Sequence, residues 1–125
     1  MTPDLLETLR THLREWEALR LTSSPETMDR EATMNRIFHF SIYRACGSEV
    51  LLPMIESLWL QSGPCTRAAI FAFSEAGEYD TASFHRALLT ALEAGDAAAA
   101  RQALVADISR PFAYLRSKLE KEGQE

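Results

Sequence analysis

Four polar side chains fall on helix faces that are otherwise apolar, and their types and spacing suit metal or ligand binding. The first two, Asn35 and His39, are four residues apart, so on a helix they share one face with Ile42 and Cys46. A buried amide or imidazole costs free energy unless it has a partner. These two side chains are therefore expected to hold something, or each other, inside the fold.

The other two polar residues lie later in the chain. His85 shares a helical face with Leu88 and Leu92, and Asp107 shares one with Leu104. Two imidazoles, one carboxylate and one amide carbonyl make a donor set of intermediate hardness. Such a set suits a divalent metal ion (zinc, nickel or manganese) with positions left open for water or a ligand.

A plainer interpretation of the same residues stays open. A histidine on an apolar stripe is often a hydrogen-bonded core or rim residue, and Asp107 can pair with an arginine such as Arg86 or Arg110. In that case the four residues form a polar pocket without a metal ion.

The elements that must position these residues are helices. Apolar residues recur at helical spacing along almost the whole chain, and no stretch alternates with period two. The sequence predicts an all-α, antiparallel bundle of about six helices in one domain, residues 1–125. The expected helices cover about residues 3–21, 25–46, 49–61, 65–76, 82–94 and 97 onward.

Turn and capping residues set these boundaries. Gly47 and Gly95 are suited to left-handed helix ends, and Asp96 to capping the last helix. Ser24 can cap the second helix ahead of Pro25, and Asp80 or Thr81 can cap the fifth. Two further prolines have a different effect. The segment 62–64, with Pro64, is expected to break or kink the chain, and Pro111 to kink the last helix.

Composition excludes two classes of partner. The formal net charge of −5 and the scattered arginines do not provide the cationic surface that nucleic acid needs, so we expect no DNA or RNA contact by this chain. No apolar run approaches the ~20 residues of a membrane helix.

The two cysteines, Cys46 and Cys65, show no metal-like spacing, and reduced thiols in the cytoplasm are expected.

Two segments resemble a known family. "NRIFHFSIYRACGSEVLLPMIESLWLQSGP" and "FHRALLTALEAGDAAAARQAL" are similar to the C-terminal effector-binding (FCD) domain of FadR-type regulators in the GntR superfamily of transcription regulators. The resemblance covers about residues 4–118. Its motifs are short, but their order and spacing together are specific.

The resemblance implies roles for the four polar residues. Asn35 takes the place of the family's first metal ligand, usually Asp, and His39 and His85 match the second and third. The fourth ligand is normally His, and this sequence has Asp107 there. One carboxylate is lost and another gained, so a weaker divalent metal site and a metal-free hydrogen-bonded pocket both stay open.

The resemblance also implies a sensor of small organic acids. The carboxylate effector is expected to meet Asn35, His39, His85 and an arginine fork, for which Arg67 is our choice. The family's N-terminal winged helix, which reads DNA, is not among these residues. We therefore expect either a fragment of a longer regulator or an N-terminally truncated one, and a homodimer in both cases.

Two further functions remain as alternatives to a non-enzymatic sensor. One is a metal-dependent hydrolase or lyase built in a helical bundle, although no extra Glu or Tyr is placed as an obvious general base. The other is a dimerisation fragment whose pocket is inactive.

Overall fold

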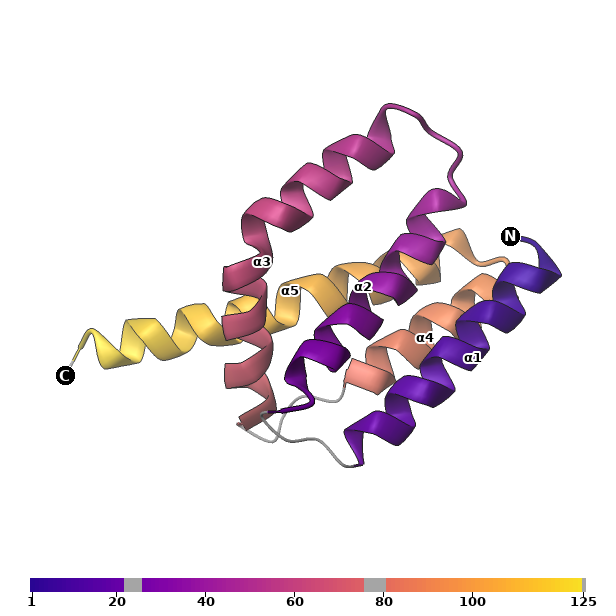
Figure 1. The fold of residues 1–125 in the computed structure, drawn as a ribbon. Helices are drawn as coiled ribbons and strands as arrows, with labels where there is room; N and C mark the ends of the chain where they lie inside the picture. Colours follow the sequence, from indigo (N-terminus) through magenta and orange to yellow (C-terminus); the bar gives the residue numbers. More distant parts are fainter. Residues whose placement is uncertain (22–25, 76–80, 125) are drawn as a thin grey trace.

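The computed structural model describes residues 1–21, 26–75 and 81–124. Within these segments the chain forms helices and no strands, which confirms the all-α bundle (Figure 1). Five helices follow one another along the chain: α1 (Pro3–Arg20), α2 (Met28–Arg44), α3 (Leu51–Glu75), α4 (Thr81–Glu93) and α5 (Ala97–Glu122).

Of the two alternatives predicted for residues 62–64, a break and a kink, the break is wrong, because α3 runs through this segment with Pro64 inside the helix. Proline removes one backbone donor, but the turns on either side keep their hydrogen bonds. The hydroxyls of Ser62 and Thr66 also donate to backbone carbonyls one turn earlier, at 2.8 and 3.0 Å. Figure 1 shows α3 changing direction part-way along its length, the usual effect of an internal proline. One long bent helix therefore replaces the two that the sequence suggested.

The long last helix also contains its proline. α5 continues through Pro111, which is buried, to Glu122. The kink expected at Pro111 stays a prediction.

The predicted helix ends are mostly correct. Gly47 and Gly95 both have positive φ, at 66° and 68°, as left-handed helix ends require. The Asp96 carboxylate caps α5 by accepting from the Ala99 amide at 3.0 Å. In the same way the Ser48 hydroxyl accepts from the Leu51 amide at the start of α3, at 3.0 Å.

The second helix starts later than expected. α2 begins at Met28, preceded by Thr27, whereas the predicted start at Pro25 lies outside the described residues. The candidate caps Ser24 and Asp80 lie outside the described residues, and α4 begins at Thr81.

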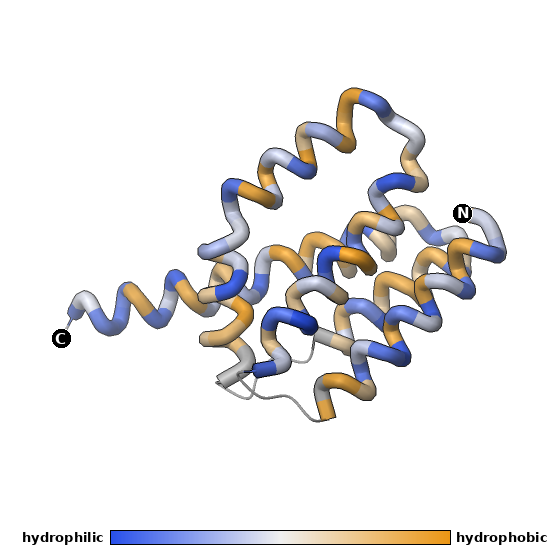
Figure 2. Tube along the Cα trace, viewed as in Figure 1, coloured by the Kyte–Doolittle hydropathy of each residue, from blue (hydrophilic) through white to orange (hydrophobic). Residues whose placement is uncertain are grey.

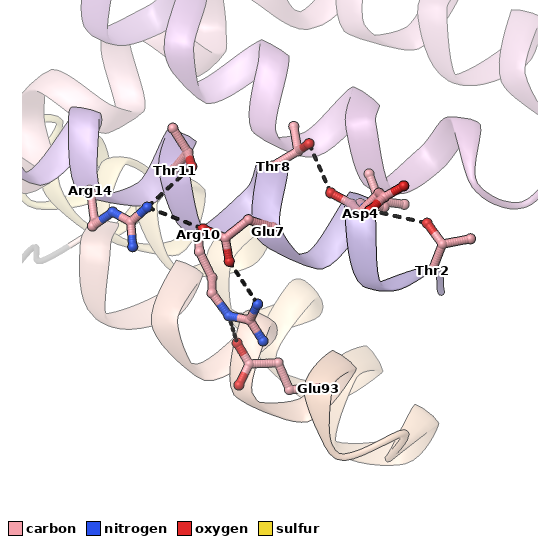
Figure 3. Close-up of polar contacts among 9 residues, drawn as sticks. Thr2, Asp4, Glu7, Thr8, Arg10, Thr11, Arg14 and Glu93 are labelled. Atoms are coloured by element: carbon pink, nitrogen blue, oxygen red, sulfur yellow. Dashed lines mark hydrogen bonds and ion pairs between the residues drawn. The ribbon is translucent and has the colours of Figure 1, made fainter.

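The core lies where α1, α2 and α4 meet. Its buried residues are Leu9, Leu13, Phe38, Leu88 and Leu89. Figure 1 shows α1 and α4 side by side, in agreement with their contacts. Figure 2 shows apolar positions along both helices. At the rim, Arg10 of α1 pairs with Glu93 of α4 at 2.9 Å (Figure 3). Both side chains are more than a third exposed, so this pair contributes little, and packing holds the helices together.

α3 packs mainly on α5 and has little contact with α2. Its first half carries large apolar side chains that are mostly exposed, and Figure 2 shows several such positions along it. They are Leu51, Met54, Leu58 and Leu60, with Val50 just before the helix. None of the described helices combines the length and apolar character needed to cross a membrane.

Candidate metal and ligand site

The four polar residues singled out by their spacing all lie inside the bundle. α2 positions Asn35 and His39, α4 positions His85, and α5 positions Asp107. Their exposed fractions are 8%, 2%, 0% and 7% in that order. Each helix turns an otherwise apolar face inward, which carries its polar residue into the interior.

One carboxylate oxygen joins the two imidazoles. The Oδ2 atom of Asp107 lies 2.8 Å from Nε2 of His39 and 3.1 Å from Nε2 of His85. Both distances are short enough for hydrogen bonds. Three helices are therefore connected through a single buried oxygen atom.

This arrangement keeps the carboxylate ionised. Burial alone would raise the pKa of Asp107, but the hydrogen bonds from His39 and His85, together with their charges, outweigh it and hold the pKa at about 2. At neutral pH the interior thus contains a fixed negative charge whose partners are histidines. The arginine partners considered from the sequence do not take part, since Arg86 pairs with Glu17 and Arg110 lies over the Phe84 ring.

Tyr43 is a neighbour of the site that the sequence argument missed. Its hydroxyl lies 3.3 Å from Nδ1 of His39, the ring nitrogen that faces away from Asp107. Burial, and the negative charge of Asp107, raise the pKa of Tyr43 to about 12, so the hydroxyl stays protonated at neutral pH. The available signal was its spacing, because Tyr43 follows His39 by one helical turn.

Aromatic rings enclose the imidazoles. Phe38 stacks on His85 with ring centroids 4.5 Å apart, and Trp16 meets the same ring edge-on at 4.4 Å. Trp59 lies 5.8 Å from the His39 ring. Such tight packing fixes the ring orientations and excludes water from the far side of the site.

A cavity of about 410 Å³ opens beside the cluster. Asn35, His39, Tyr43 and Asp107 line it, whereas His85 does not and lies behind Asp107. Within the described part of the chain, the Asn35 side chain has no hydrogen-bond partner, so its amide is available to whatever fills the cavity.

Arg67 does not line the cavity. Its side chain is 60% exposed and pairs with Asp29 on the surface of α2. Its role in effector binding stays a prediction.

The three strongest donors fit a metal ion. One ligand atom from each of His39, His85 and Asp107 lies within 4.8 Å of the others. Neighbouring ligand atoms around a tetrahedral ion with ~2.1 Å bonds are ~3.4 Å apart, so the contacts of 2.8 and 3.1 Å from Asp107 would lengthen slightly to admit the ion. Two imidazole nitrogens and one carboxylate oxygen also match the preferences of zinc, nickel and manganese.

The family comparison covers the whole of this site. The model of the FCD domain matches residues 1–110, which include all four polar residues. The chain belongs to the FCD domain family. FCD domains are the ligand-sensing regulatory domains of GntR/FadR-type transcription regulators, which are not enzymes. Comparison of this FCD domain with curated proteins and with solved structures gave no match.

Proposed function

We propose that this FCD domain senses a small organic carboxylate at a divalent metal ion held by His39, His85 and Asp107. The observation that carries the proposal is the pair of imidazole nitrogens on one buried carboxylate oxygen, at 2.8 and 3.1 Å. A buried cluster of this kind beside a cavity supports a ligand site, because ionisable groups with shifted pKa values gather at functional sites.

Charge gives the site its preference for an anion. Two neutral imidazoles and one carboxylate leave a divalent ion with a net charge of about +1. When bound, the ion would supply that positive charge and open coordination positions to the effector. Asn35 would assist, since its amide can donate to a carboxylate oxygen or lend its own oxygen to the ion.

The protein's residues divide this work between them. His39, Asn35 and Tyr43 reach the cavity, so the effector would contact them directly. His85 is fully buried and would hold the ion from the side away from the cavity. In this scheme the effector's carboxylate is met at the ion, and no contact from Arg67 is needed.

Sensing would work through the helices that the site connects. A ligand that favours one arrangement of α2, α4 and α5 shifts the domain toward that arrangement, by as much as its affinities for the two states differ. The DNA contact would belong to another part of the regulator, since this acidic chain lacks a cationic surface for it.

We also propose that the domain forms a homodimer. Leu51 and Met54 are 47% and 58% exposed and lie one turn apart at the start of α3, and Val50, 74% exposed, lies just before the helix. Apolar side chains grouped in this way favour burial against a partner. Light scattering at micromolar concentration should give twice the chain mass, and a monomer that persists at 100 µM would contradict this part.

Calorimetric titration of the metal-stripped domain tests the metal proposal. Zinc, nickel or manganese should bind at one ion per chain, and His39→Gln should abolish binding. His12→Gln is the matched control, because His12 is the remaining histidine and lies on α1, outside the site. Binding that survives His39→Gln, or no heat above dilution for all three metals, would contradict the proposal.

A further inference from the structure

The cavity beside the metal-binding cluster has a polar side and an apolar side. The polar side is formed by residues of α2 and α5: Asn35, His39, Tyr43 and Asp107. The wall from α3 consists of Ile55, Leu58, Trp59 and Ile70, together with two hydroxyl residues.

Those two hydroxyl residues do not make the α3 wall polar. Ser62 donates its proton to the Leu58 carbonyl at 2.8 Å, and Thr66 donates to the Ser62 carbonyl at 3.0 Å. Each hydroxyl has one proton to give, so neither can donate to a ligand without giving up its bond within α3.

The α5 side beyond Asp107 is apolar as well. Leu104, Ile108 and Phe112 continue the lining there. Among the described residues that line the cavity, none is a lysine or arginine. A charged group placed against these walls would be desolvated without a partner, which costs free energy.

We infer that the effector is a monocarboxylate with an apolar body, alkyl or aryl, and not a small polyacid. This inference rests on the proposed function, which supplies the ion that holds the carboxylate. The carboxylate of the effector lies at the cluster of His39, His85 and Asp107. Its apolar body lies against α3, where it contacts Leu58 and Trp59. A volume of about 410 Å³ is within the usual range of small-molecule sites and leaves room for such a body.

The test compares three acids on the zinc-loaded domain by calorimetry. Acetate probes the carboxylate group alone. Hexanoate and adipate both have six carbons, but the far end of hexanoate is a methyl group and that of adipate is a second carboxylate. Each fully buried methylene is worth ~4-fold in affinity, so hexanoate should bind at least ~10-fold more tightly than acetate. Adipate should bind at least ~10-fold more weakly than hexanoate, because its second carboxylate meets the apolar wall.

A matched pair of variants locates the apolar body. Leu58→Lys places a cation at the cavity, and since Leu58 is 64% exposed, the fold should tolerate it. The preference for hexanoate over adipate should then shrink or reverse. The control is Leu60→Lys. Leu60 is on the same helix and 72% exposed, but it does not line the cavity, so this change should leave the preference for hexanoate over adipate as it is.

The outcomes separate this inference from the proposed function. If acetate binds and adipate binds as tightly as hexanoate, or more so, the inference is overturned while the carboxylate sensor stands. Equal binding of hexanoate and acetate overturns it in the same way. If none of the three acids binds the zinc-loaded domain, both the sensor proposal and this inference are contradicted.

Discussion

His39 and His85 contact the same oxygen of Asp107, although the three residues come from three different helices. One buried carboxylate thereby connects α2, α4 and α5 beside a cavity. A ligand bound at such a site would act on three helices at once, as the proposed sensing requires.

Replacement of the shared carboxylate should remove most of the metal affinity. Asp107→Asn takes away the only negative ligand among the three. Zinc affinity should fall by more than ~100-fold, because loss of a residue that only hydrogen-bonds to a metal ligand already costs ~10- to 100-fold. Competition with a chromogenic chelator measures the change. Asp29→Asn, at an 82% exposed aspartate that pairs with Arg67, should have no effect. Equal affinities for the wild type and Asp107→Asn would show that the ion binds elsewhere.

Restoration of a carboxylate at position 35 should strengthen the site. Asn35→Asp exchanges a neutral amide for a charged ligand that lines the same cavity as Asp107, and zinc affinity should rise by ~10-fold or more. Without metal, the two carboxylates repel each other, so the melting temperature of the stripped variant should fall. An unchanged zinc affinity would mean that residue 35 does not reach the ion.

Tyr43 should act through His39 and not on the ion itself. If Nε2 of His39 binds the ion, Nδ1 carries the proton and donates to the Tyr43 oxygen at 3.3 Å. Tyr43→Phe should therefore weaken zinc binding by no more than ~10-fold, because the bond is long. The control is Tyr114→Phe, whose ring packs on Phe73 outside the cavity. A complete loss of binding in Tyr43→Phe would require a direct role for the hydroxyl.

The ionised Asp107 should make the stripped domain sensitive to acid. Its folded-state pKa of about 2 lies below the ordinary 3.8, so its contribution to stability is complete above about pH 4 and is lost as pH falls through 2. Urea unfolding with chelator present should show the wild type more stable than Asp107→Asn at pH 5, and the difference should narrow toward pH 2.5. A difference that stays constant or widens would contradict this pKa.

The sequence predicted the helical fold, and the inward position of the four polar residues, better than the helix boundaries. Asn35 and His85 lie on apolar helix faces, and both are buried with those faces. Periodicity works for these residues because a helix face is a local property.

What the sequence did not reveal depends on contacts between helices. The local pattern at Pro64 predicts a break or a kink, whereas packing on α5 and the hydrogen bonds of neighbouring turns keep α3 continuous. Similarly, local pattern says nothing of whether Asp107 meets an arginine or two histidines, since that choice depends on how α5 lies across α2 and α4. The position of Arg67 on the surface follows from its pairing with Asp29, another contact between helices.

X-ray absorption at the zinc edge of the loaded domain tests the central claim most directly. We predict a first shell of nitrogen and oxygen atoms at ~2.0–2.1 Å from the zinc, with outer-shell scattering from two imidazole rings. In His85→Gln the scattering should fit one imidazole ring. A sulfur shell at ~2.3 Å would contradict this site, because it would place the ion at Cys46 or Cys65. A spectrum that is the same in the wild type and in His85→Gln would also contradict it.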